Sequence, residues 1–282
     1  MHINEDIIDK KIISIDDMKR IELSILKEIK HFCEENNLTY FLLGGTLLGA
    51  VRHGGFIPWD DDIDIGMPRK DYEKFINIFQ SEQCTLFKPG DKQYNYPFCK
   101  VSLNDTLVYE LESCKKPIFG VYVDVFPLDF IPNEKKQQIK ILRKIERWKI
   151  FLSVKNTKIL KGKRLMRNLG VFFGKILLTP VPLAWLCKKF DKFISNCTRS
   201  SKYMGNFVWG YGSREITESK VFDESIKIKF EEDEFNVPKY YDVWLTNVFG
   251  DYMTLPPEDK RVSNHNMRAF YIIKNHEKEV DA

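Results

Sequence analysis

Apolar residues recur at helical spacing near the start of the chain. Their spacing of three or four positions predicts a helix over residues 16–34 with one buried face. The residues of this stripe are Met18, Ile21, Ile25, Ile29 and Phe32. Ser14 followed by Asp17 is typical of a helix start, because the serine hydroxyl can accept a hydrogen bond from the first turn. Asn36 and Asn37 indicate where the helix ends.

The pattern then changes to short strands and turns. Leu38–Leu43 is a continuous apolar run, which predicts a buried strand leading directly into Gly44–Thr46. A short helix over 47–52 follows, and residues 56–67 end with the alternation of a strand. Pro68 then begins another helix with an apolar stripe. The predicted order is helix, strand, glycine turn, helix, strand and helix.

Three more strands are predicted before the middle of the chain. Val101–Leu103 and Thr106–Leu111 lie on either side of a two-residue turn, and Gly120–Phe126 is a third strand that ends at Pro127. The first part of the chain therefore mixes helices with short strands.

Residues 133–202 have a different character. Their apolar positions form two helical stripes among many lysines and arginines, so we expect a basic amphipathic helical insertion. The stripes comprise Ile141, Ile145, Trp148 and Leu152, and then Leu165, Leu169, Phe172, Phe173, Ile176 and Leu177. We therefore divide the chain into a core at 1–132, the insertion at 133–202, and a C-terminal part at 203–282 that completes the domain begun by the core.

Charge is unevenly distributed between these parts. Seventeen Lys and Arg residues lie between Lys135 and Lys192, against only Glu146 and Asp191, whereas the whole chain has a net charge of +4. The remainder is therefore net negative. A basic block of this kind can meet an anionic membrane or nucleic acid, or can simply solvate its helices.

The composition limits the chemistry. The six cysteines include no Cys-x-x-Cys pair and the five histidines no His-Glu-x-x-His pattern, so zinc and redox motifs lack support and we expect free, buried thiols. A bound metal should then be a hard cation with oxygen ligands, Mg²⁺ or Mn²⁺. The polar, acidic start at 1–6 is unlike a signal peptide, so we expect cytoplasmic residence.

An acidic cluster lies within the segment Ile57–Gly66. Because side chains alternate along a strand, Asp60, Asp62 and Asp64 should share one face and Asp61 should point away. Neighbouring carboxylates raise one another's pKa unless a cation lies among them, so the pattern predicts a metal site. A solvated acidic turn is the alternative, but the apolar neighbours of these aspartates argue against it.

Two further features can complete such a site. Gly44–Thr46 lies at a strand-to-helix turn, where backbone N–H groups and a helix N-terminus can receive a phosphate. Asp124 is a single acid within the apolar run Val121–Phe126, and burying it is costly without a partner. A cation shared with Asp62 and Asp64 would be that partner; the alternative is a core lysine or arginine.

Three sequence blocks resemble the signature of the LicD family. They are Gly44–Asp64 (GGTLLGAVRHGGFIPWDDDID), Tyr122–Asp129 (YVDVFPLD) and Phe249–Pro257 (FGDYMTLPP), where the family usually has tyrosine in place of Phe249. The family looks like a branch of the nucleotidyltransferase superfamily and includes bacterial phosphocholine transferases and fukutin-related proteins. The resemblance covers most of residues 20–130 and 203–265 but not the basic insertion.

The resemblance implies a fold and a reaction. The fold would be α+β, with a nucleotidyltransferase-like mixed β-sheet flanked by helices and the basic helical insertion added to it. The reaction would be metal-dependent transfer of a phospho-alcohol from a CDP-alcohol donor to a hydroxyl of a cell-surface glycan or its lipid-linked precursor, with release of CMP. By motif, Asp62 and Asp64 become metal ligands and catalytic residues, with Asp60 beside them and Asp124 as a third ligand or base. Such chemistry depends mainly on positioning and charge neutralisation.

Other residues are candidates for binding the donor. The turn that would receive the diphosphate comprises Gly44, Gly45 and Thr46. The cations that could contact it are Arg52, Lys100 and Arg214. A quaternary ammonium group could be held by cation–π contacts with Tyr94, Tyr96, Trp209 and Tyr211.

Other function classes use similar residues. A nucleotidyltransferase would release pyrophosphate, and a nucleotide-sugar glycosyltransferase also uses an Asp-x-Asp site. The Gly-Gly turn before the aspartates favours the nucleotidyltransferase superfamily. A non-enzymatic protein whose basic helices bind membrane or nucleic acid is the weakest contender, and we expect no nucleic-acid partner.

The segment Leu169–Cys187 raises the question of membrane contact. Lys175 lies inside it and Pro180 and Pro182 interrupt it, so a membrane span is not expected. An amphipathic helix lying on an anionic membrane fits the composition better. The alternative is that its apolar face packs on the protein's own core.

Overall fold

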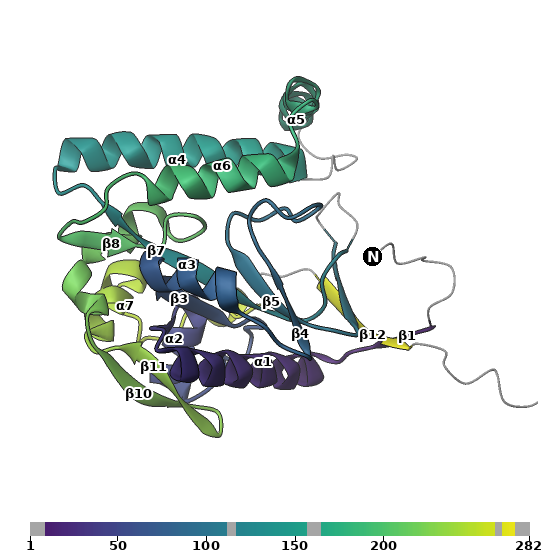
Figure 1. The fold of residues 1–282 in the computed structure, drawn as a ribbon, viewed down its shortest axis with the longest axis vertical. Coiled ribbons are helices and arrows are strands. Elements are labelled where there is room, and N and C mark those ends of the chain that lie inside the picture. Colours follow the sequence, from purple (N-terminus) through teal and green to yellow (C-terminus); the bar gives the residue numbers. More distant parts are fainter. Residues whose placement is uncertain (1–8, 112–116, 157–164, 263–266, 274–282) are drawn as a thin grey trace, which may run out of the picture.

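The computed structural model describes residues 9–111, 117–156, 165–262 and 267–273, and its fold is α+β (Figure 1). The central sheet is mixed. Its strands lie in the order β2 (Phe41–Leu42), β3 (Asp64–Pro68), β7 (Tyr122–Ile131), β5 (Cys99–Leu103) and β4 (Cys84–Phe87). β3 and β7 run parallel, whereas the other neighbours along this order are antiparallel.

Smaller β elements surround this sheet. Two short strands extend it from β7, namely β8 (Tyr203–Gly205) and β9 (Thr217–Glu218). A separate three-stranded sheet joins distant parts of the chain through β1 (Asp9–Ile12), β12 (Met267–Ile273) and β6 (Thr106–Glu110). An antiparallel hairpin is formed by β10 (Ser225–Phe230) and β11 (Asp233–Pro238).

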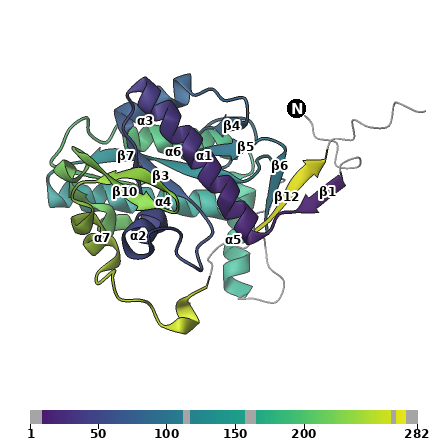
Figure 2. The same ribbon diagram turned by 90° about the horizontal axis from the view of Figure 1, so that it is seen from below.

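Helices lie on both sides of the central sheet. Those outside the insertion are α1 (Ile15–Asn36), α2 (Gly44–His53), α3 (Arg69–Ile78) and α7 (Tyr241–Phe249). The insertion comprises α4 (Lys135–Asn156), α5 (Leu165–Leu178) and α6 (Leu183–Ser195). In Figure 1, α4 and α6 run together along one side of the molecule and α1 runs along the opposite side. Figure 2 shows α5 projecting away from the sheet.

The first helix forms as its pattern predicts. Ser14 is its N-cap, and the hydroxyl accepts a hydrogen bond from the backbone N–H of Asp17 at 3.1 Å. Asn37 ends it in the left-handed conformation with φ 52°, which asparagine tolerates better than most residues. The buried stripe faces the core.

Two predicted boundaries are wrong near the glycine turn. The strand expected over Leu38–Leu43 is only the two residues of β2, and the helix expected at 47–52 already begins at Gly44. The glycines are therefore the first turn of α2 rather than a turn before it. Asp60–Ile63 lies outside regular secondary structure, because β3 begins only at Asp64.

The strand expected to end at Pro127 continues to Ile131. The backbone N–H of Asp124 donates to the backbone oxygen of Ile63, the residue just before β3, so the backbone groups of residues 125, 127 and 129 point to the other edge of β7. On that side, β7 pairs with β5 only as far as Val125, and its pairing with β8 begins at Asp129. The missing N–H of proline therefore falls in the gap between two partner strands, where it costs no ladder hydrogen bond.

The helical insertion is fastened to the sheet by one ion-pair network. Arg69 at the start of α3 donates to both carboxylate oxygens of Asp129 on β7, at 2.8 and 2.6 Å, and to Asp191 on α6 at 2.8 Å. Such bidentate geometry is the strong form of an ion pair. Within the described residues, no helix is long and apolar enough to cross a membrane.

The cysteines for which the structure gives positions carry free thiols. Four of them are buried, namely Cys33, Cys84, Cys99 and Cys187, and Cys197 is partly buried. Cys114 lies outside the described residues.

Candidate active site

Three charged residues are cross-strand neighbours in the central sheet. Asp64 is the parallel-register partner of Asp124, and Lys100 is the antiparallel partner of the same Asp124. The chain thus brings a lysine and two aspartates from β5, β7 and β3 side by side, although they are distant in sequence. The Lys100 ammonium donates to Asp124 Oδ1 at 2.5 Å.

Two glycines let the aspartates approach the start of α2. A Cβ at Gly44, whose φ is +57°, would lie 2.7 Å from Asp64 Oδ2, and a Cβ at Gly45 would lie 2.3 Å from Asp60 Oδ2. Any larger residue would push these carboxylates away. The helix N-terminus carries partial positive charge, so it stabilises negative groups held there.

Thr46 has a different place from the one expected. Its buried hydroxyl accepts a hydrogen bond from the backbone N–H of Asp64 at 2.8 Å, which fixes the first residue of β3 against α2. Thr46 is not among the residues that line the cavity described next. The hydrogen bond of Thr46 therefore positions the carboxylate of Asp64, and Thr46 does not reach the place where a diphosphate substrate would lie.

A cavity of about 520 Å³ gathers the three sequence blocks. From the first block it is lined by Gly44, Gly45, Arg52, Ile57, Trp59, Asp60, Asp62 and Asp64. From the second block Asp124 and Phe126 contribute, and from the third Phe249, Asp251, Tyr252, Thr254 and Pro256. Motifs separated by more than a hundred residues therefore form one site.

Asp61 differs from its neighbours in burial. It is 6% exposed and does not line the cavity, whereas Asp60 and Asp62 do. It is nevertheless close to them, because one carboxylate oxygen from each of these three aspartates lies within 4.8 Å of the others. The alternation of side chains along a strand therefore does not explain why Asp61 differs from Asp60 and Asp62, since β3 starts only at Asp64.

The acidic cluster is electrostatically strained. Burial, followed by the charges of Asp62, Asp124 and Asp60, raises the pKa of Asp64 well above its usual value, and Lys100 opposes this shift. Burial and the charges of Asp62 and Asp61 likewise raise the pKa of Glu22 on α1. A cation among the carboxylates would relieve this repulsion.

Lys100 is enclosed by aromatic rings. Its ammonium lies 3.4 Å from the ring centroid of Tyr122 and 4.6 Å from that of Tyr96, and the residue is 2% exposed. It does not line the cavity, so the direct diphosphate contact expected of it does not fit its position. Asp124 thus has the core lysine that was the alternative partner, while it also lines the cavity beside Asp62 and Asp64.

The expected aromatic cage divides into two pairs. Trp209 and Tyr211 line the cavity and are 54% and 42% exposed. Tyr94 is fully buried and Tyr96 donates its hydroxyl to Glu110, so neither belongs to the cavity lining. Only the first pair can meet a ligand there.

The two candidate arginines also differ. Arg52 lines the cavity and donates to the backbone oxygen of Tyr252 at 2.8 Å, which joins the first block to the third. Arg214 is exposed, donates to the backbone oxygen of Val248 and lies outside the cavity lining. Arg52 is therefore the better-placed cation.

Sequence reasoning missed Glu215, which lines the cavity although it is only 1% exposed. Its carboxylate accepts hydrogen bonds from the backbone N–H of Tyr211 at 3.1 Å and from Trp244 Nε1 at 3.3 Å. Burial raises its pKa to about 7. Nothing in the local pattern distinguishes this glutamate from a surface charge next to Arg214.

The carboxylates of the cavity fit a hard divalent cation. Four of them reach one space from two adjacent strands and the segment before β3, namely Asp60, Asp62, Asp64 and Asp124. Oxygen ligands of this kind suit Mg²⁺ or Mn²⁺. Within the described residues, Asp60, Asp61 and Asp62 form the group whose carboxylate oxygens lie close enough together to hold one ion.

The family follows from this combination of fold and site. A family model described as the LicD/FKTN/FKRP nucleotidyltransferase domain matches residues 37–152. Together with the full-length relative below, this match shows that the chain belongs to the LicD family.

Two relatives show how far the similarity extends. The chain is 30% identical over 275 residues to lipopolysaccharide cholinephosphotransferase LicD of Haemophilus influenzae, an alignment covering 93% of this chain and 100% of that protein. A stretch of 38 residues is 53% identical to ribitol 5-phosphate transferase FKRP of Homo sapiens, covering 14% of this chain and 8% of that protein.

Proposed function

We propose that this chain is a transferase that moves a phosphate-linked alcohol from a CDP-alcohol donor to a hydroxyl of a glycan or its lipid-linked precursor and releases CMP. The observation that carries the proposal is the cavity in which the three LicD-like blocks meet around Asp60, Asp62, Asp64 and Asp124. The relatives named above, a cholinephosphotransferase and a ribitol phosphate transferase, support the class of reaction.

Asp60, Asp62, Asp64 and Asp124 would hold a divalent cation, which when bound would neutralise charge on the donor's phosphates. Gly44 and Gly45 leave room for two of these carboxylates beside the N-terminus of α2. Arg52 adds a cation at the cavity wall. Trp209 and Tyr211 offer exposed rings to the alcohol or the base.

Asp124 serves as a ligand rather than as a base in this proposal. The Lys100 ammonium at 2.5 Å stabilises the ionised carboxylate, and aromatic rings exclude water from that lysine. A carboxylate held in its charged form is a weak proton acceptor but a good ligand for a cation.

A donor panel tests the reaction. The protein is incubated with CDP-choline, CDP-ethanolamine, CDP-glycerol and CDP-ribitol, with Mg²⁺ or with a chelator, and the nucleotide products are separated. Metal-dependent release of CMP is expected with at least one donor. Release of pyrophosphate from a nucleoside triphosphate would favour a nucleotidyltransferase, and release of a nucleoside diphosphate from a nucleotide sugar would favour a glycosyltransferase; either would overturn the proposal.

Substitutions test the cluster. Asp62→Asn and Asp64→Asn should each reduce turnover by at least a thousandfold while the protein stays folded, because each removes a charged ligand. Asp61→Asn should be milder, since Asp61 does not line the cavity. Asp223→Asn, at an exposed acid, is the matched control. An Asp61 variant as inactive as the Asp62 variant, with Asp64→Asn still active, would refute the assignment.

A further inference from the structure

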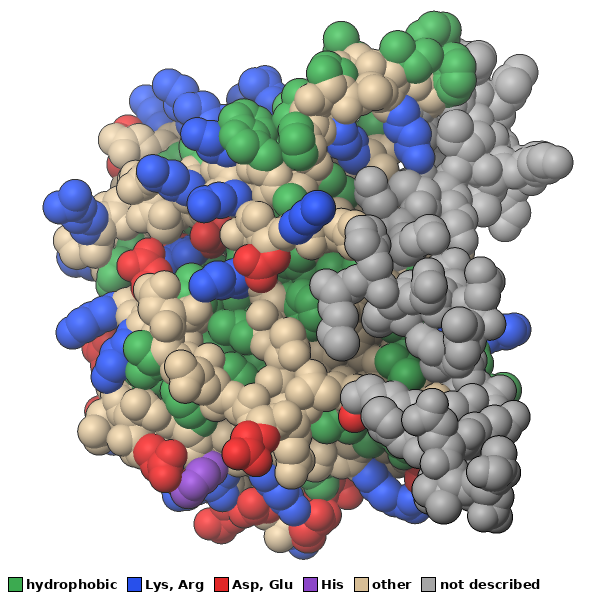
Figure 3. Space-filling model, turned by 45° about the vertical axis from the view of Figure 1, so that its right-hand side comes forward, with side chains coloured by type: hydrophobic (Ala, Val, Ile, Leu, Met, Phe, Trp, Pro, Cys, Tyr) green, Lys and Arg blue, Asp and Glu red, His purple; other side chains and the backbone are tan. Residues whose placement is uncertain are grey.

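The helical insertion exposes large apolar side chains. On α5, Phe172, Phe173, Ile176 and Leu177 are 49%, 64%, 56% and 79% exposed. More lie on the neighbouring helices, namely Ile139, Ile150 and Phe151 on α4 and Trp185 on α6. Figure 3 shows hydrophobic side chains gathered at this end of the molecule with Lys and Arg side chains beside them. Several large apolar side chains left exposed on neighbouring helices often mark an interaction surface.

The structure identifies which side of α5 is turned inward. A Cβ at Gly174 would lie 2.8 Å from the side chain of Val154, so the glycine face of α5 packs on α4. The Lys155 ammonium donates to the backbone oxygens of Leu178 and Val181 and so secures the end of α5 to α4. The exposed apolar residues of α5 therefore do not pack on the protein's own core. Leu165 and Leu169, expected in the same stripe, have side chains outside the described part.

The outer face of α4 is basic. Ile145 and Leu152 are buried and Lys149 is partly buried, so the side of α4 that carries them faces the protein. The exposed cations of this helix are Lys135, Lys136, Lys140, Arg143, Lys144 and Arg147. Glu146 is the single acid along α4. Lys188, Lys189 and Lys192 extend the exposed positive charge onto α6.

We propose that this surface, formed by the outer faces of α4 and α5 with the exposed cations of α6, docks on an anionic lipid bilayer. The apolar side chains enter the interface and the cations meet lipid headgroups, each cation strengthening binding by about fivefold. Charge alone would also suit nucleic acid, but four large apolar side chains on α5 have no role against phosphates. A second copy of the chain would have to bring the same positive charge against itself.

The docked surface is joined to the cavity. Lys149 on the inner side of α4 donates to the backbone oxygens of Trp209 and Gly210, at 3.2 and 3.3 Å, and both residues line the cavity. Arg69 holds α6 to the sheet through Asp191 and Asp129. Hydrogen bonds and ion pairs therefore connect the helices that carry this surface to the residues of the cavity. The docking proposal does not depend on the reaction, because it is measured without a donor.

Vesicle flotation tests the surface. The full chain should float with vesicles of phosphatidylcholine and phosphatidylglycerol, but much less with phosphatidylcholine alone, and added salt should release it. Arg143→Glu with Arg147→Glu should weaken partitioning by about thirtyfold or more, because two attractive charges are lost. Phe173→Ser with Leu177→Ser should weaken it by about tenfold or more at unchanged charge.

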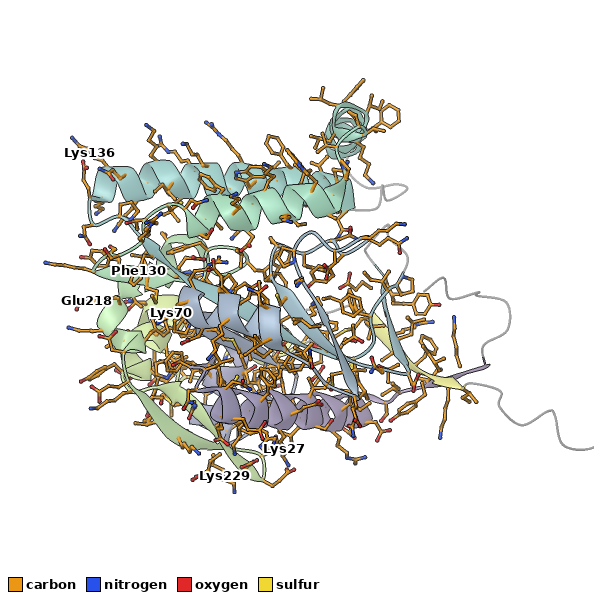
Figure 4. All side chains as sticks on the ribbon, viewed as in Figure 1. Lys27, Lys70, Phe130, Lys136, Glu218 and Lys229 are labelled. Atoms are coloured by element: carbon orange, nitrogen blue, oxygen red, sulfur yellow. The ribbon has the colours of Figure 1, made fainter. Side chains whose placement is uncertain are left out.

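A matched control separates this surface from net charge. Lys70→Glu with Lys229→Glu makes the same change of charge, and both lysines lie away from α4 in Figure 4, where Lys136 marks the outer end of that helix. This control should float as the wild type does. Circular dichroism checks that each variant is folded.

Four results would overturn the proposal. The first is that the wild-type protein stays in the soluble fraction with anionic vesicles at low salt, and the second is that the control pair weakens binding as much as the α4 pair does. The third is that a DNA duplex displaces the protein from vesicles regardless of the α5 substitutions, and the fourth is that the protein forms a stable dimer in sedimentation that Phe173→Ser with Leu177→Ser dissociates.

Discussion

Glu215 gives the fold a measurable dependence on pH. It is 1% exposed and accepts hydrogen bonds from the backbone N–H groups of Tyr211 and Asn206 and from Trp244. Burial, the largest effect, raises its pKa from the usual 4.5 to about 7. The folded protein therefore binds this proton more tightly than the unfolded chain does.

The sign and size of the effect follow from linkage. For an acid whose folded pKa is raised, the stabilisation is fully present below pH 4.5 and is lost as the pH rises through about 7. Between pH 5 and pH 8 this one group should lower the free energy of unfolding by roughly 2.5 kcal/mol.

Glu215→Gln removes the titration and nearly keeps the shape. Its amide has one acceptor oxygen where the carboxylate has two, so a donor such as Trp244 Nε1 loses its partner, at a cost of about 1–3 kcal/mol that does not depend on pH. The variant should therefore be less stable than the wild type at pH 5. At pH 8, where the wild type carries a buried charge, the difference in free energy of unfolding between the two proteins should be smaller by roughly 2.5 kcal/mol.

Urea unfolding of both proteins at pH 5, 6, 7 and 8 provides the measurement. The difference between the two curves isolates Glu215, because other buried acids such as Asp191 and Glu22 remain in both proteins. Glu218→Gln, at an exposed position nearby, is the control and should leave the curve unchanged. A constant gap between wild type and Glu215→Gln across the range would refute the reasoning.

Two other predictions concern the acidic cluster. Lys100→Met should lower the free energy of unfolding by about 3–5 kcal/mol, because Asp124 keeps its buried charge without the lysine. Adding Asp124→Asn should restore part of this loss. If Lys100→Met alone unfolds in urea as the wild type does, the prediction is wrong. Mg²⁺ at a hundred times its dissociation constant should stabilise the wild type by about 2.7 kcal/mol, and Asp64→Asn should abolish that gain. Thermal melts with Mg²⁺ and with a chelator give the answer, and an equal response of both proteins would exclude Asp64 from the metal site.

Much of the site could be predicted because its residues lie in local patterns. Asp124 stands out as the one acid in an apolar strand, and the glycines stand next to the aspartates in sequence. Sequence could not show that Asp124 is the register partner of both Asp64 and Lys100, because register depends on how three strands pair. Lys100 consequently looked like a surface cation that could meet phosphate.

The boundaries were less predictable than the elements. Gly44 and Gly45 indicated a turn by propensity, yet they begin α2 because the carboxylates of Asp64 and Asp60 must come close to the helix start. Pro127 indicated a strand end, yet β7 continues because its partner strands leave a gap there. In both cases a tertiary contact overrides a local preference.

The wall of the cavity depends on both the core and the insertion. Glu215 accepts from the N–H of Tyr211, while Lys149 donates to the carbonyls of Trp209 and Gly210, so one short loop is held by its N–H groups from one side and by its oxygens from the other. Burial lowers the pKa of Lys149, with Glu146 and Glu215 opposing the shift. Because Lys149 belongs to α4, these hydrogen bonds connect the helical insertion directly to the loop. The positions of Trp209 and Tyr211 at the cavity wall are therefore set jointly by Glu215 and by α4.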